Sequence, residues 1–313
     1  MPARKKLSRS YIRAKKKKRN LLPLLVVFFT FIIFFFIKSS HYWDGKSKLS
    51  LVIRNDDGNV LVSTFDPDTG EIINVIIPGD TEVELARKLG KTRIKNAWQI
   101  GMNANYEGLV LVETVTRNFK FPVYIWADKK AEGFSEANYA SIFSAMITPY
   151  KTNLKVGDRV RLALFAISVK NVEREEIRLK DTTYLKETPL IDGQLGYKLT
   201  SNFPQNVLIV FNNTSLTKDT RAVIQDESGD NQISSMVAQV LEVEGAKVVQ
   251  IDKKEVNDFG CVVGGSNIKL SIIVSRVFSC KLGESNLFGE SDLFTSKNHT
   301  LYIKLGKEFA SRF

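Results

Sequence analysis

Residues 49–79 read LSLVIRNDDGNVLVSTFDPDTGEIINVIIPG, and this stretch contains three apolar runs separated by turn-forming residues. The runs cover residues 49–53, 59–65 and 71–77, and the second alternates between apolar and polar side chains. The intervening Asn-Asp-Asp-Gly and Asp-Pro-Asp-Thr-Gly segments are typical of tight turns between neighbouring strands. The stretch therefore predicts an antiparallel meander at the start of a folded domain.

The pattern after the meander is mixed, which predicts an α/β (α+β mixed) domain over residues 49–200. The run at 158–169 fits either a helix or a strand, because its apolar positions satisfy both periods. Residues 170–203 are charged and rich in turn formers, so we expect a solvated segment that is partly a linker. Further helices are expected at 81–88, 92–101, 105–119 and 135–148, and a further strand at 122–126.

Residues 204–313 predict a second, small β-α-β-α-β sandwich. Its expected strands are 207–211, 246–251 and 300–305, with a polar loop over 216–230. The helix expected at 231–244 has an apolar face at helical spacing and is followed by Gly245, a common helix stop. That face consists of Ile233, Met236, Val237, Val240 and Leu241, and the second helix repeats the spacing at Leu270, Ile273, Val274, Val277 and Phe278.

The N-terminus predicts a transmembrane helix. Residues 1–20 contain ten Lys or Arg and no acidic residue, and residues 21–37, LLPLLVVFFTFIIFFFI, contain no charge. A helix of this length spans about 25 Å, the short end of what crosses a bilayer. The basic flank places the N-terminus in the cytoplasm and both domains outside the membrane. Residues 38–48 then form a juxtamembrane linker, and the expected membrane-interface residues are Arg19, Lys38, Tyr42 and Trp43.

A cleaved signal peptide is the alternative reading of this segment. The long basic region, the Phe-rich core and the sequence Lys38-Ser-Ser-His41 after it, which lacks a small-residue cleavage site, favour a retained single-pass anchor. We therefore expect a cell-membrane protein with extracytoplasmic domains.

The charge of the chain is concentrated in that tail. The whole chain carries +11, whereas without the ten N-terminal charges 35 basic residues face 34 acidic ones, a net charge of +1. The outer part therefore has no general electrostatic attraction for nucleic acid. A basic tail of twenty residues also provides no DNA-binding fold, so a membrane-anchored transcription regulator is not favoured. The expected partner of the tail is the membrane itself.

Few residues suit catalysis or metal binding. Cys261 and Cys280 are the only cysteines, and an extracytoplasmic location favours a disulfide between them over two buried free thiols. The only histidines are His41 and His299, so neither a closed zinc site nor a histidine-based triad is expected. No phosphate-binding glycine motif is present. We expect no metal site.

Two parts of the chain resemble known envelope proteins. Residues Val60 to Asp80, which lead into Ile77-Pro-Gly-Asp80, resemble the opening of the LytR-CpsA-Psr domain, where a hairpin leads into an Ile-Pro-Arg-Asp loop, and Arg93-Ile-Lys-Asn-Ala-Trp98 resembles the segment that follows. The C-terminal part resembles the LytR C-terminal accessory domain through 207–213, 231–249 and 301–310.

The resemblance implies a bacterial cell-envelope protein. Active relatives transfer polyprenyl-pyrophosphate-linked glycopolymers to peptidoglycan, holding the pyrophosphate with arginines and with Mg²⁺ bound by aspartates. Asp80 and Arg93 match the family pattern and are the candidate catalytic residues, and the alternative for either is a turn former or a surface charge. Gly79 replaces the loop arginine, and Asp158-Arg-Val-Arg161 is a poor counterpart of the later Arg-rich motif.

These departures favour a degenerate LytR-CpsA-Psr-like domain that acts by binding or scaffolding in cell-wall assembly, with peptidoglycan or envelope proteins as partners and no cofactor. The alternative is a working glycopolymer transferase with a rearranged site, which would take polyprenyl pyrophosphate and Mg²⁺. Enzymatic activity is therefore uncertain from the sequence and is not the favoured expectation.

Overall fold

The computed structural model describes residues 42–201, 203–283 and 300–313, together with Pro23 and Val27. The predicted basic tail and the rest of the predicted anchor, with Arg19 and Lys38, lie outside the described residues, as do His41 and His299. Among the residues that are described, no helix combines the length and the apolar character needed to cross a bilayer.

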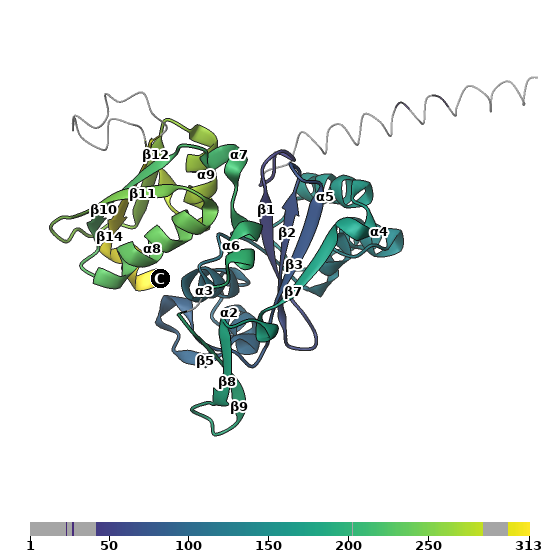
Figure 1. Cartoon of the computed structure of the whole chain (residues 1–313), viewed down its shortest axis with the longest axis horizontal. Coiled ribbons are helices and arrows are strands. Elements are labelled where there is room, and N and C mark those ends of the chain that lie inside the picture. Colours follow the sequence, from purple (N-terminus) through teal and green to yellow (C-terminus); the bar gives the residue numbers. More distant parts are fainter. Residues whose placement is uncertain (1–22, 24–26, 28–41, 202, 284–299) are drawn as a thin grey trace, which may run out of the picture.

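The first unit is built on a five-stranded sheet in the order β6-β1-β2-β3-β7 (Figure 1). The predicted meander is confirmed: β1 (Leu49–Arg54), β2 (Val60–Asp66) and β3 (Glu71–Ile77) pair antiparallel. Gly58 and Gly70 adopt positive φ angles of 86° and 74° in the two turns, a conformation that glycine reaches without strain. The edge strands β6 (Ile125–Ala127) and β7 (Arg174–Arg178) run parallel to β1 and β3.

Helices cover both faces of this sheet. Side chains alternate along each strand, so Leu51 and Phe65 pack under α4 (Tyr139–Ile147) and α5 (Val156–Ser168) on one face. The other face, with Val52, Val62 and Val75, packs against α2 (Ala97–Asn103) and α3 (Leu109–Phe119). The result is a three-layer α/β/α arrangement, and the ambiguous segment at 158–169 is a helix.

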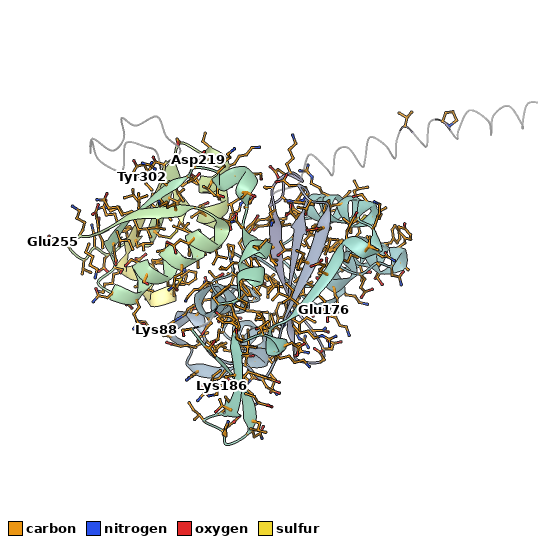
Figure 2. The ribbon with its side chains drawn as sticks, in the orientation of Figure 1. Lys88, Glu176, Lys186, Asp219, Glu255 and Tyr302 are labelled. Carbon is orange, nitrogen blue, oxygen red and sulfur yellow. A yellow bond between two sulfur atoms is a disulfide. The ribbon has the colours of Figure 1, made fainter. Side chains whose placement is uncertain are left out.

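Two predictions for the connecting segments are wrong. Residues 81–88, expected as a helix, form the strand β4 (Glu82–Glu84) and the 3₁₀ turn η1 (Ala86–Lys88), because β4 pairs with β5 (Lys91–Arg93). The expected linker at 170–203 contains β7 and the hairpin of β8 (Leu185–Pro189) and β9 (Leu195–Leu199), which projects from the first unit around Lys186 (Figure 2). The remaining 3₁₀ turns are η2 (Ile94–Asn96), η3 (Lys129–Phe134), η4 (Asn171–Glu173) and η5 (Leu179–Asp181).

The second unit is a five-stranded mixed sheet in the order β11-β10-β14-β12-β13. Helix α8 (Asn231–Glu244) ends at Gly245 as predicted, with φ of 106°. The expected strand at 207–211 is instead helix α6 (Gln205–Phe211), and the expected loop at 216–230 contains the strand β10, which lies between β11 and β14. The other elements are α7 (Thr214–Thr217), β10 (Arg221–Glu227), β11 (Lys247–Lys253), β12 (Cys261–Gly265), α9 (Ile268–Val277), β13 (Lys281–Leu282), β14 (Thr300–Gly306) and α10 (Lys307–Arg312).

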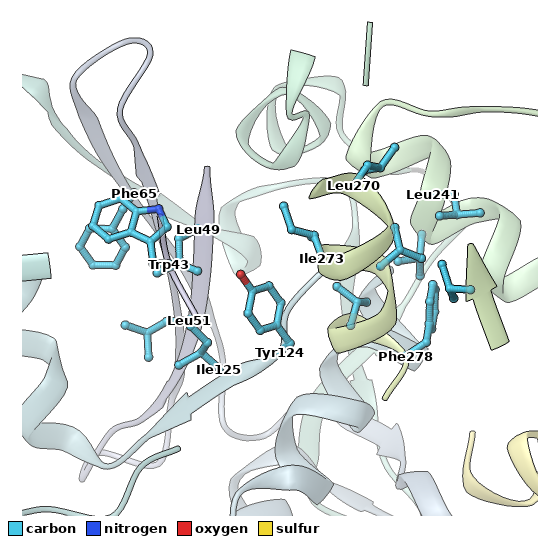
Figure 3. Close-up of a cluster of buried hydrophobic side chains, with 14 of the residues drawn as sticks. Trp43, Leu49, Leu51, Phe65, Tyr124, Ile125, Leu241, Leu270, Ile273 and Phe278 are labelled. Atoms are coloured by element: carbon cyan, nitrogen blue, oxygen red, sulfur yellow. The ribbon is translucent and has the colours of Figure 1, made fainter. Parts of the chain in front are cut away.

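The two units share their hydrophobic cores. Tyr124, at the start of β6, lies between the first sheet and the α9 residue Ile273 (Figure 3). In the second hydrophobic cluster, Phe211 of α6 stacks on Phe121 with ring centroids 4.3 Å apart. The units therefore pack against each other as parts of one folded body and are not joined only by a linker.

Candidate functional site

Asp80 and Arg93, the two residues marked by the family resemblance, lie in direct contact. Asp80 follows β3 in the turn after Pro78, and Arg93 ends β5, which β4 holds in register. An Arg93 guanidinium nitrogen, Nη1, lies 2.7 Å from Asp80 Oδ1, and Lys95 Nζ lies 2.7 Å from the same oxygen. The structure therefore brings together two positions that are thirteen residues apart in the sequence.

A third element completes this cluster. Asp192, in the turn of the β8–β9 hairpin, accepts hydrogen bonds from Arg93 Nε at 2.9 Å and from Arg93 Nη2 at 3.0 Å. Arg93 Nη1 also donates to the carbonyl oxygen of Leu195 at 3.2 Å. A two-point arginine–carboxylate contact is among the stronger ion-pair geometries in proteins. Arg93 therefore also fastens the hairpin to the first unit.

The opposite charges in the cluster favour the ionised forms of its carboxylates and of Arg93. Hydrogen bonds from Lys95 and then Arg93 hold the pKa of Asp80 below its usual range. The Arg93 guanidinium likewise lowers the pKa of Asp192, and the two carboxylates raise the pKa of Arg93. Asp80, Asp192 and Arg93 are therefore ionised at neutral pH.

A cavity of about 230 Å³ lies beside Arg93 and Asp192. Lys91 Nζ lies 2.8 Å from Glu82 Oε1 at its wall, and Lys198 approaches the same carboxylate at 3.8 Å. The hydrogen bond from Lys91 lowers the pKa of Glu82. The cavity is below the usual size of a ligand pocket, so it has room for an anionic group and none for a long isoprenoid chain. Its lining is Glu82, Lys91, Thr92, Arg93, Asn96, Leu190, Ile191 and Asp192.

A larger cavity, of about 440 Å³, lies between the β8–β9 hairpin and helix α8. Tyr184, Phe203 and Leu208 give it an apolar and aromatic wall. Lys120 also faces it, and burial lowers the pKa of Lys120 to about 8. This cavity offers more apolar contact than the charged one beside Arg93.

The cluster does not suit a magnesium ion as it stands. Mg²⁺ prefers carboxylate oxygens and water in octahedral geometry, whereas Asp80 and Asp192 both direct oxygens at Arg93. Within the described part of the chain, no three His, Cys, Asp or Glu side chains gather closely enough to hold a metal ion.

The predicted disulfide between Cys261 and Cys280 is confirmed. It joins the start of β12 to the residue before β13, across helix α9. Arg312 of α10 lies beside it, with Nη2 at 3.8 Å from Cys261 Sγ. The bond is therefore a structural cross-link within the second unit.

The prediction that Trp43 lies at the membrane interface is wrong. Its side chain is only 3% exposed, because the ring packs edge-on against Phe165 at 5.6 Å and the indole N–H donates to the carbonyl oxygen of Ser47. Tyr42 is half-buried and lies 6.2 Å from the ring of Tyr124. Residues 42–48 are therefore part of the fold and not a free linker.

The segment Asp158 to Arg161 holds residues 42–43 in place. Asp158 accepts the backbone N–H groups of Tyr42 and Trp43, and Arg161 Nη1 donates to the carbonyl oxygen of Trp43 at 2.9 Å. Arg159 lies over the ring of Tyr150. These contacts give Asp158 and Arg161 a structural role in holding residues 42–43.

Sequence reasoning missed Asp192, Lys91 and Lys198. Asp192 stands 99 residues from Arg93 in a region interpreted as a linker. The signal that would have found it is the Leu190-Ile-Asp-Gly193 turn, which is flanked by short strand-like runs.

Comparisons with known proteins gave matches among solved structures. No family model matches the chain, and no curated protein matches it either. B. subtilis TagV is 12% identical over 64% of this chain and 99% of that chain, with a TM-score of 0.40. B. subtilis TagT is 16% identical over 51% of this chain and 87% of that chain, with a TM-score of 0.37. A further similar structure is the LytR-CPS2A-psr family protein YwtF (TagT) with bound octaprenyl pyrophosphate lipid. It is 17% identical over 51% of this chain and 87% of that chain, with a TM-score of 0.36. The chain is thus similar to a solved structure that bears the name of the family its residues Val60 to Asp80 resemble.

Proposed function

We propose that this chain is a membrane-anchored, extracytoplasmic protein of the bacterial envelope that binds a polyprenyl-pyrophosphate-linked glycopolymer and transfers it to the cell wall. The observation that carries this proposal is the contact of Asp80 with Arg93 at 2.7 Å. The sequence resemblance marks these two positions separately, and the fold joins them in one charged cluster.

The lysines of the cluster supply the chemistry for a pyrophosphate. Lys91 and Lys95 keep 51% and 42% of their side chains exposed, and each is paired with one carboxylate. The Lys95–Asp80 pair is exposed on both sides, and such pairs contribute about 0–1 kcal/mol, so a phosphate oxygen can replace the Asp80 carboxylate at small cost. The Glu82 side chain is only 6% exposed, so Lys91 keeps this partner and can donate a further hydrogen bond to a phosphate from its exposed ammonium group. Arg93 can keep its two-point contact with Asp192 and present positive charge beside the cavity. Leaving phosphates carry negative charge, which fixed cations stabilise in the transition state.

Binding or scaffolding without transfer is the second candidate. Arg93 is already held by two carboxylates and a carbonyl oxygen, and Gly79 stands where active relatives have an arginine. This arrangement favours a structural role for Arg93 and an envelope protein that holds glycopolymer or peptidoglycan without reacting with it.

The first test measures binding of octaprenyl pyrophosphate to the full chain in lipid nanodiscs. We expect saturable binding without added Mg²⁺, and at least about tenfold weaker binding in the Lys91→Ala/Lys95→Ala double variant, because two charge-assisted contacts are lost. The matched control is Lys254→Ala, an exposed lysine of the second unit. Absence of binding by the folded native chain contradicts the proposal.

A transfer assay separates the two candidates. The donor is a polyprenyl-pyrophosphate-linked glycopolymer. Attachment of its phosphoglycopolymer to a peptidoglycan hydroxyl with release of polyprenyl phosphate supports the transferase, whereas binding without either product supports the scaffold. The membrane anchor has a separate test, N-terminal sequencing of the mature protein: a chain that begins near residue 40 contradicts a retained anchor.

A further inference from the structure

Helices α4 and α5 carry an unusual number of exposed apolar side chains. On α4, Tyr139 is 71% exposed and Phe143 and Ile147 are each 57% exposed. These three residues follow one another at spacings of four, so they line one face of the helix. On α5, Val156, Leu164 and Ile167 are 52%, 49% and 50% exposed. We call these six residues the apolar patch.

The apolar patch is separate from the hydrophobic core of the first unit. The inner faces of the same helices are already buried against the sheet, with Ile142 of α4 and Leu162 of α5 at 2% and 0% exposure. Residues 137–150, which include all of α4, contain no charged side chain. A helix that faces water normally carries its charges on the outer face, and a contiguous exposed apolar surface indicates a binding partner.

The patch lies next to the point where the chain enters the fold. The Asp158 carboxylate, in the first turn of α5, accepts the N–H of Tyr42 at 2.9 Å, and the ring of Phe165 on α5 packs against Trp43. The segment that follows the anchor region is therefore fixed to a helix of the patch. Figure 1 shows α4 and α5 side by side on the same face of the sheet.

Exposed lysines border the patch. Lys151 and Lys155 lie in the connection between α4 and α5, and Lys170 follows the end of α5. Aromatic and aliphatic residues on one face with lysines at the border are the pattern of helices that lie in a membrane interface. Basic groups at such a border are attracted to anionic lipid headgroups.

We propose that the apolar patch of α4 and α5 lies in the headgroup region of the bilayer, so that the first unit rests on the membrane by this face. The proposal rests on the membrane anchor of the proposed function, and it adds an interaction surface whose partner is lipid. A second copy of the chain or another protein on this face is an outcome that the test distinguishes.

The test uses the full chain in vesicles that contain a brominated phospholipid, which quenches nearby fluorophores. Because Cys261 and Cys280 are bonded to each other, a thiol-reactive fluorophore labels only an introduced cysteine. The reporter variants are Phe143→Cys and Ile147→Cys, with Tyr139→Cys as a further position. The matched control is Ile251→Cys, which is 41% exposed on β11 of the second unit.

We expect at least about twofold stronger quenching at residues 143 and 147 than at residue 251, because an interfacial helix face enters the bilayer by several ångströms. Equal quenching at all positions overturns the proposal. Weak quenching together with crosslinking between copies at residue 143 also overturns it and assigns the face to a dimer.

Failure of the proposed function gives a different result. The quenching experiment does not depend on octaprenyl pyrophosphate binding. If the chain does not bind this ligand but quenching is strong at residues 143 and 147, the proposed function fails and the proposed membrane surface is still supported. A chain that a carbonate wash strips from the vesicles contradicts the retained anchor, whereas the quenching measured before the wash still reports on the membrane surface.

Discussion

The buried carboxylate of Asp158 accepts the backbone N–H of Tyr42 at 2.9 Å, although 116 residues separate the two in the sequence. The same carboxylate accepts the N–H of Trp43 at 3.2 Å and that of Lys155 at 3.1 Å. One side chain thus fixes the entry of the chain and caps the start of helix α5. An unpaired buried N–H is costly, so this single carboxylate holds together two distant parts of the first unit.

The substitution Asp158→Ala removes all three acceptor contacts. We expect a loss of about 1–3 kcal/mol in the free energy of unfolding, and a smaller loss for Asp158→Asn, which keeps one acceptor oxygen. Urea denaturation measures this difference. Asp258→Ala, at an exposed position that pairs with Lys307, is the control and should leave stability nearly unchanged. An Asp158→Ala variant as stable as the native chain contradicts this account of residues 42–43.

The buried side chain of Glu244 should make the free energy of unfolding depend on pH near neutrality. The side chain lies at the end of α8, where burial raises its pKa to about 7 and the hydrogen bond from Asn213 opposes the shift. A folded-state pKa above the unfolded value means that the stabilisation is complete below about pH 4.5 and is lost as the pH rises through 7.

Glu244→Gln removes the ionisation and so the pH dependence. We expect the variant to match the native chain near pH 5 and to exceed it by up to about 3 kcal/mol at pH 8, since each pKa unit corresponds to about 1.4 kcal/mol. Urea denaturation at the two pH values gives the comparison. The control is Glu242→Gln, at an exposed position of the same helix, and it should show no such gain in stability at pH 8. If the free energy of unfolding depends on pH in the same way in all three proteins, the raised pKa of Glu244 is ruled out.

The Arg93 contacts predict that the β8–β9 hairpin loosens in acid. The pKa values of Asp80 and Asp192 are lowered in the fold, so their stabilisation is present above the usual aspartate value of about 4 and is lost below it. Arg93→Ala should produce the same loosening at pH 7. Hydrogen exchange over residues 185–199 measures the effect. Arg178→Ala, which removes an exposed pair with Glu176 on β7, should leave the hairpin protected.

The disulfide predicts a redox-dependent stability of the second unit. Cys261 and Cys280 are 19 positions apart, and a loop of this length corresponds to about 3 kcal/mol of stabilisation in the chain-entropy model. Reductant should therefore lower the melting temperature of the native chain. The Cys261→Ala/Cys280→Ala variant should melt at the lower temperature with or without reductant. A native chain whose melting is unaffected by reductant contradicts this prediction.

The sequence was most informative where structure is set by local signals. The meander at 49–77 has turn residues at its corners, and helix α8 combines a regular apolar face with Gly245 at its end. Both were predicted correctly. The run at 207–211 was not, because five consecutive apolar residues carry no period, and its packing on Phe121 decides in favour of a helix. Strand β10 was missed because Arg221, Gln225 and Asp226 disguise a short apolar centre.

The candidate site was predictable only in part. Asp80 and Arg93 were found through resemblance, but no local pattern predicts their contact. The turn at residues 190–193 could have predicted the hairpin, but not the pairing of Asp192 with Arg93. Trp43 was misplaced for the same reason, since an aromatic residue near an apolar segment looks the same whether it faces lipid or a helix 120 residues away. Contacts between distant segments decide both cases.

The way the chain enters the fold also determines how the protein carries mechanical load. Tyr42 is held by Asp158 of the first unit, and Arg276 of the second unit donates to its carbonyl oxygen at 2.8 Å. Tension applied to the chain on the N-terminal side of Tyr42 therefore reaches both units at one residue. The force therefore acts on the interface between the two units from the start, and the units resist being unfolded one after the other.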